Sequence, residues 1–183
     1  IIFCSSSYPR DALAAAIAAH LGQIPLAGCT SAGEITGRGY DADSLLFMGF
    51  PEDSFTFNVL HVTDIDGFDR DDAQRQVRHL AANARHVSRI LGPQASQVAL
   101  FLVDGLSHRE ELLTMTVQDA LGDIPLIGGS SGDGLLFSET GVLCDGAFRS
   151  GTAAIVILTS ARPMQVHSEC FYEPGPIRMV VTA

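Results

Sequence analysis

Leu21-Gly-Gln-Ile-Pro-Leu-Ala-Gly-Cys-Thr-Ser31 and Leu121-Gly-Asp-Ile-Pro-Leu-Ile-Gly-Gly-Ser-Ser131 are two stretches of this chain that match in register without a gap. Each follows a segment that is typical of an apolar strand, a polar turn and a helix, so the repeated unit is larger than the matching words. We interpret this pattern as an internal duplication. Two such loops that face one another across a pseudo-two-fold axis would frame a single binding site.

The rest of the chain alternates between helical and extended patterns. One helix is expected from Pro9 to Leu21, a long one through Ala73 to Leu91, and a third after Ser107, where Ser107 and Glu110 have the spacing of a capping box. Strands are expected at 1–4, 24–29, 45–50, 55–62, 98–103, 141–144, 147–158 and 165–170.

These elements predict an α/β fold of mixed α+β type, in which two related strand-helix-strand units carry added antiparallel strands and the sheets and helices form layers. The related halves are expected at about 1–62 and 97–170. At 183 residues the chain is expected to form one domain, 1–183.

Composition excludes several functions. The 11 basic residues are all Arg, so chemistry that needs a lysine amine is absent. The net charge of −10 disfavours nucleic acid and anionic lipid as partners, and the apolar runs are too short to span a membrane. The four scattered cysteines indicate reduced thiols and a cytoplasmic location. The start at Ile1, inside an apolar run and without an initiator Met, argues against a signal peptide and suggests a fragment.

The two loops are interpreted as cradles for a small polar ligand. Glycines let the backbone approach a ligand closely and leave amides and hydroxyls to receive it. An acid beside each loop suits an amine-bearing ligand, such as an amino acid, better than a phosphate. The alternative is that the loops are tight turns only. The candidate ligand-binding residues are Gly28, Thr30, Ser31, Gly33, Glu34, Gly128, Gly129, Ser130, Ser131 and Asp133.

A serine hydrolase is a competing interpretation, because Gly128-Gly-Ser-Ser-Gly132 has the Gly-x-Ser-x-Gly pattern of a nucleophile elbow around Ser130. A true elbow leads from a strand directly into a helix, whereas Asp133-Gly134 here predicts a turn and then extended chain. The first copy has Thr30 at the position of Ser130, so the duplication does not preserve the pattern. We therefore expect no catalytic activity.

Histidines offer a second alternative. His167 and Cys170 have a His-x-x-Cys spacing, but in a strand they would point to opposite faces, which is poor geometry for zinc. A single imidazole suffices as an axial ligand to haem. His167 is the leading candidate for that role, with His61 and His108 behind it, although a lone histidine is more often structural.

The sequence resembles the N-terminal half of the FIST domain family. The resemblance rests on four features in the expected order, which together extend over nearly the whole chain: the Ile24–Glu34 segment, Phe101–Gly105, Pro125–Gly129 with Asp133, and Pro174-Gly-Pro176. The family positions carried over are Gly28, Ser31, Gly33, Glu34, Gly128, Gly129 and Asp133. The chain stops where the family's C-terminal half would begin, so a site shared between the halves would be incomplete.

The resemblance implies an intracellular bacterial sensory module that binds small ligands such as amino acids and acts in signal transduction with an output domain. One branch of the family resembles haem-binding nitric-oxide sensors that act on histidine kinases. We therefore expect a ligand-binding sensory domain without catalytic activity, whose partners are a small molecule and a signalling protein such as a histidine kinase. A haem-based sensor and a serine hydrolase remain the alternatives.

Overall fold

The computed structural model describes residues 1–170, 172, 173 and 175–177. Pro174, from the Pro-Gly-Pro motif, lies outside the described residues, as does the end of the predicted domain. The helices are α1 (Arg10–Leu21), α2 (Arg70–Leu91) and α3 (Glu110–Leu121). The strands are β1 (Ile2–Ser5), β2 (Gly28–Ser31), β3 (Glu34–Thr36), β4 (Gly39–Asp41), β5 (Leu45–Phe47), β6 (Phe55–Val62), β7 (Ser96–Val103), β8 (Leu126–Ser130), β9 (Val142–Cys144), β10 (Ala147–Arg149) and β11 (Ala153–Ser160).

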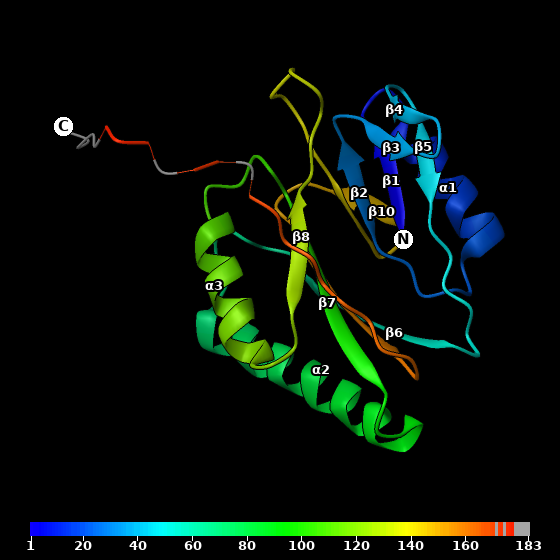
Figure 1. Ribbon diagram of the computed structural model, residues 1–183. Coiled ribbons are helices and arrows are strands. Elements are labelled where there is room, and N and C mark those ends of the chain that lie inside the picture. The colour runs from blue at the N-terminus through cyan, green and yellow to red at the C-terminus, as the bar shows by residue number, and fades with distance from the viewer. Residues whose placement is uncertain (171, 174, 178–183) are drawn as a thin grey trace.

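Two mixed sheets form the body of the molecule (Figure 1). One has the strand order β10-β9-β2-β1-β5, the other has the order β6-β11-β7-β8, and β3 and β4 form a separate small hairpin. Parallel pairs occur inside each copy of the repeat, and β11 runs antiparallel to both β6 and β7. The predicted mixture of parallel units with antiparallel additions is confirmed.

The strands of the repeat pair in the same way in both copies. β1 pairs with β2 in parallel with Ile2 opposite Gly28, and β7 pairs with β8 in parallel with Phe101 opposite Gly128. A Cβ atom on Gly28 would collide with the carbonyl oxygen of Ile2, and one on Gly128 would collide with that of Phe101. Both glycines are therefore required for close approach of the two backbones.

The layers are α2 and α3, the β6-β11-β7-β8 sheet, the other large sheet, and α1. Alternation along β11 explains this stacking, because successive side chains point to opposite faces. Ile155 packs into the core under α2 and α3, whereas Ala154 packs with Cys29 of β2 and Val156 packs with Ala27, which directly precedes β2. Every residue of β11 is buried, which suits its apolar, β-branched composition.

The predictions for the second and third helices differ in outcome. Asp69 caps α2 by accepting a hydrogen bond from the Asp72 amide at 2.7 Å, and an alanine-rich stripe with Val77 faces the sheet. The predicted capping box of the third helix is wrong. α3 begins after Arg109, no side chain caps it, and the Ser107 amide instead donates to the Asp104 carbonyl in a turn.

Three predicted strands also need correction. Residues 165–170 are not a strand but irregular and exposed, because no neighbouring strand pairs with them in the described part of the chain. The strand predicted at 24–29 begins only at Gly28, and the run 147–158 is divided by a bend at 150–151 into β10 and β11. Within the described residues, none of the helices combines the length and apolar composition needed to cross a membrane.

Candidate functional site

The loops that follow β2 and β8 are in direct contact. The Gly132 amide donates a hydrogen bond to the Thr30 carbonyl at 3.0 Å. A Cβ atom on Gly132 would lie 3.2 Å from the Ala32 amide nitrogen, so the two backbones touch. Our prediction that the two loops lie together at one end of the sheets is confirmed.

Thr30 is the centre of this junction. It is completely buried, and its hydroxyl accepts a hydrogen bond from the Gly141 amide at 3.1 Å. Its own amide donates to the Gly141 carbonyl at 2.9 Å. Thr30 therefore joins the first loop to the chain that leads into β9, and its polar atoms are satisfied by protein groups.

The acidic residue of the first loop, Glu34, is held by hydrogen bonds. Glu34 is 3% exposed and accepts hydrogen bonds from the Ser31 hydroxyl and, at 2.5 Å, from the Ser44 hydroxyl. Gly33 lies under the Tyr40 ring, where any larger residue would collide with the phenol, and Tyr40 donates to the Ala32 carbonyl at 2.8 Å. The sequence placed Glu34 correctly beside the loop, and the structure shows which hydroxyls hold it.

The second loop closes on Asp133. This residue is 4% exposed and accepts hydrogen bonds from the amides of Phe137, Ser138 and Glu139 at 2.7–3.0 Å. The Glu139 and Ser138 amides are the main reason that the pKa of Asp133 lies below its usual range. Asp133 thus shapes the 134–139 turn as an ionised acceptor.

Asp104 ties the second copy together and was missed by sequence reasoning. It lies directly after β7, is 4% exposed, and accepts hydrogen bonds from the Thr140 hydroxyl, the Gly151 amide and, at 3.0 Å, the Leu106 amide. Nearby, the Ser131 hydroxyl accepts from the Gly105 amide at 3.2 Å. The sequence did offer a signal for Asp104, namely a single acidic residue directly after an apolar strand. Polar groups of a site often lie at the carboxyl ends of parallel strands.

Ser130 and Glu110 form the open part of this region. Ser130 is exposed at the end of β8, and its hydroxyl donates to the Glu110 carboxylate at the start of α3. Partial burial, and next the charge of Asp104, raise the pKa of Glu110. Gly129 is exposed beside them, with open space where a Cβ would stand. Sequence reasoning assigned Glu110 to the capping box and so overlooked it.

This arrangement does not form a nucleophile elbow. Ser130 ends a strand, but residues 131–133 are irregular and 134–135 form a turn, so no helix follows to provide an oxyanion hole. The partner of Ser130 is a carboxylate, and in the described part of the chain no histidine is hydrogen-bonded to it. The expectation that the context disfavours an elbow agrees with this geometry.

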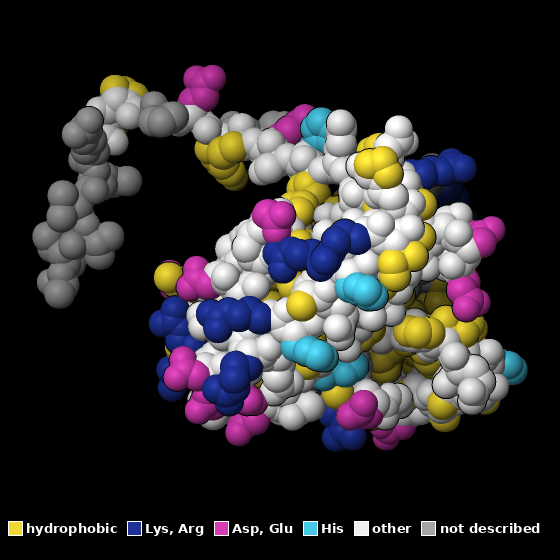
Figure 2. Space-filling view, turned by 90° about the horizontal axis from the view of Figure 1, so that it is seen from below, with side chains coloured by type: hydrophobic (Ala, Val, Ile, Leu, Met, Phe, Trp, Pro, Cys, Tyr) yellow, Lys and Arg dark blue, Asp and Glu magenta, His cyan; other side chains and the backbone are white. Residues whose placement is uncertain are grey.

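His167 does not fit an axial haem ligand. It lies in the irregular, exposed stretch 163–170 and not in the strand that was expected. Cofactor sites are concave and mostly apolar. An apolar cavity of about 670 Å³ does lie at the amino ends of β1 and β2, lined by Ile24, Phe47, Met48 and Phe57 among others, but its lining contains no histidine. Hydrophobic side chains gather around a hollow on the right of the view in Figure 2.

Comparison with known proteins gives one match. The sequence profile of the FIST N domain family matches residues 1–183. Neither the search of curated proteins nor that of solved structures found a match.

Proposed function

Because the chain belongs to the FIST N domain family, a family of sensory domains, we propose that it senses a small amine-bearing molecule at the open end of β8. The amine would meet the Glu110 carboxylate, with Ser130 and Gly129 beside it. The observation that supports this choice is the exposed Ser130–Glu110 pair next to two interlocked Gly-Ser loops.

Availability distinguishes Glu110 from the two acids that the sequence suggested. The buried Glu34 and Asp133 already accept hydrogen bonds from hydroxyls and amides of their own loops. Glu110 is half-buried and its described partner is one exposed hydroxyl. A direct role for Glu34 or Asp133 stays a prediction, and our proposal gives them the task of holding the loops in shape.

Electrostatics favours a cation at Glu110. Partial burial and the nearby charge of Asp104 both disfavour the ionised form of this carboxyl group. A bound ammonium group would offset that repulsion and stabilise the carboxylate. The negative charge of the whole chain, −10, attracts cations rather than anions.

The backbone of β8 offers a complement for the other end of an amino acid. β8 is an edge strand, and the Ser131 amide donates to the Val103 carbonyl of β7 at 2.7 Å. Because backbone groups alternate in direction along a strand, the Ser130 amide points to the free edge. A carboxylate can accept a hydrogen bond there while its amine contacts Glu110.

Signal transmission in this proposal uses the contact between the copies. A ligand on β8 changes the environment of Ser130, which precedes the Gly132 amide bonded to Thr30. The change would reach an output partner, such as a histidine kinase, through the first copy. This partner class comes from the resemblance to sensory modules.

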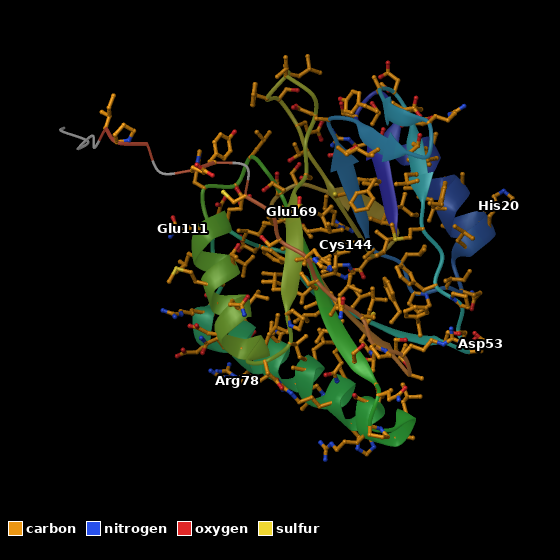
Figure 3. The ribbon with its side chains drawn as sticks, in the orientation of Figure 1. His20, Asp53, Arg78, Glu111, Cys144 and Glu169 are labelled. Carbon is orange, nitrogen blue, oxygen red and sulfur yellow. The ribbon has the colours of Figure 1, made fainter. Side chains whose placement is uncertain are left out.

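A thermal-shift screen of amino acids and related amines tests the proposal. A ligand present at 100 times its Kd stabilises the folded state by about 2.7 kcal/mol. We expect Glu110→Gln to abolish the shift, while Glu111→Gln, a change at the adjacent exposed position on α3 (Figure 3), leaves it intact. Glu34→Gln and Asp133→Asn report whether the loop acids also contact the ligand.

Two results would contradict it. A shift that survives Glu110→Gln would place the ligand elsewhere. If no compound shifts the protein and an ester-cleaving activity disappears in Ser130→Ala, the serine hydrolase interpretation replaces the sensory one.

A further inference from the structure

Three side chains with metal-binding chemistry meet where the turn after β9 lies against β6: His61 is half-buried, Cys144 is buried and Asp145 is exposed. His61 lies on β6, Cys144 ends β9, and Asp145 is the first residue of the turn between β9 and β10. Figure 3 labels Cys144 near the middle of the view. This cluster is separate from the loops discussed above.

Strand registers explain why the side chains face one another. His61 pairs with Ala154 of β11, which packs towards the other sheet together with Val142. Cys144 is two residues beyond Val142 on β9 and therefore points to the same face. Asp145 has a positive φ of 50° in an Asp-Gly hairpin turn, and this turns its carboxylate back beside Cys144.

The distances approach those of a metal site. The ligand atoms of the three residues all lie within 4.8 Å of one another, and Cys144 Sγ is 3.6 Å from Asp145 Oδ2. Tetrahedral zinc with usual bond lengths holds its ligand atoms roughly 3.3–3.6 Å apart. The thiol and the carboxylate already have this spacing. A side-chain rotation that moves the imidazole nitrogen by about 1 Å would bring it to the same distance from both.

His61 carries an unexplained polar atom. Its Nε2 is buried, and among the described residues nothing forms a hydrogen bond with it. Buried polar atoms are rarely left without a partner in native proteins. A metal ion would satisfy this nitrogen.

We propose that His61, Cys144 and Asp145 bind one divalent metal ion of the zinc class, which fastens the β9–β10 hairpin to β6. Mixed nitrogen, sulfur and oxygen ligands suit Zn²⁺ and its spectroscopic substitute Co²⁺, and they are unlike the all-oxygen sites of Mg²⁺ or Ca²⁺. Three protein ligands leave a fourth position for water. The metal displaces the thiol proton when it binds, because the thiolate is the ligand form.

Cobalt titration of the metal-free, reduced protein tests this site. We expect one equivalent of Co²⁺ to bind with thiolate charge-transfer absorption, and one equivalent of Zn²⁺ to remove that absorption. Cys144→Ser should abolish the charge-transfer band. Asp145→Asn, which tolerates the same turn conformation, should weaken binding at least tenfold. Cys170→Ser is the matched control, since this thiol is exposed and far along the chain, and it should change nothing.

Circular dichroism of each variant separates a lost site from a lost fold. If Cys144→Ser is unfolded, Asp145→Asn and Cys170→Ser still decide the question. The proposal is overturned if wild-type protein shows no thiolate band, if the band survives Cys144→Ser, if Asp145→Asn binds as tightly as wild type, or if Cys170→Ser removes the band.

Discussion

The two copies of the repeat have the same local fold but opposite surroundings. In the first copy, β2 is an inner strand with β1 on one side and β9 on the other, and Thr30 is fully buried. In the second copy, β8 is an edge strand, and Ser130 is exposed at the position that corresponds to Thr30.

The difference comes from the path of the chain after the second copy. The chain after β8 crosses to the first copy. There the Gly141 carbonyl accepts a hydrogen bond from the Thr30 amide, and β9 pairs with the edge of β2. Within the described residues, no strand covers the free side of β8 in return. The two units thus pair their strands alike, but the segments outside them bury the loop of the first unit and leave β8 of the second unit accessible.

The largest expected effect tests the feature that the copies share. Gly28→Ala and Gly128→Ala should each destabilise the protein by about 3 kcal/mol or more, because the new methyl group would collide with a backbone carbonyl of the neighbouring strand. Gly129→Ala, with open space around it, should stay within about 0.5 kcal/mol. Urea denaturation measures all three. Equal stabilities would show that the strands do not approach this closely.

The corresponding residues at the end of the first strand of each copy should differ in how much stability is lost when they are replaced. Asp104→Asn should cost about 2–3 kcal/mol, because an amide group would face donors that now bond a buried carboxylate. Ser5→Ala, at the matching position, which is the last residue of β1, should cost about 1 kcal/mol or less, because the partners of the lost hydroxyl, Ser7 and Asp43, are exposed and can bond to water instead. If denaturation experiments show similar losses of unfolding free energy for the two variants, Asp104 is not the residue that holds the second copy together.

The buried and exposed hydroxyls of the junction should respond differently to removal. Thr30→Val keeps the shape but leaves the Gly141 amide without its acceptor, so we expect a loss of about 1–2 kcal/mol. Ser130→Ala should change the free energy of unfolding by no more than about 0.5 kcal/mol. Thermal denaturation of both variants checks this, and a larger effect at Ser130 would contradict the contrast between a buried first loop and an accessible β8.

Asp133 should give an effect that depends on pH. Its pKa is lowered in the folded state, so its contribution to stability is present above the pKa of the unfolded chain and is lost as pH falls through the folded value. Asp133→Asn should therefore flatten the acid limb of a stability profile below about pH 4. Amide hydrogen exchange in the 134–139 turn provides a local measurement. An unchanged acid limb would show that another carboxylate controls it.

Much of the fold could be predicted because its signals are local. The apolar runs of β6 and β7, the alanine-rich stripe of α2 and the matching Gly-Ser loops each define an element or a contact without help from distant residues. The stretch 165–170 was predicted to be a strand, but no strand in the described part of the chain pairs with it, and a local pattern cannot reveal that.

The site was harder to predict because its roles depend on neighbours far along the chain. Glu34 and Asp133 were expected beside the loops, but only the structure shows that their own loops engage them. Glu110 and the His61–Cys144–Asp145 cluster join residues from separate strands and helices, so no short motif marks them.

The open edge of β8 has a consequence for solution behaviour. An uncovered strand is a template on which other chains can extend a sheet, and aggregation begins at such edges. Two of the five residues in Leu126–Ser130 are glycines, which are poor strand formers and offer no side chain for a foreign strand to pack on. The two glycines that keep the backbone of β8 accessible to a small molecule therefore also make this edge a poor starting point for aggregation.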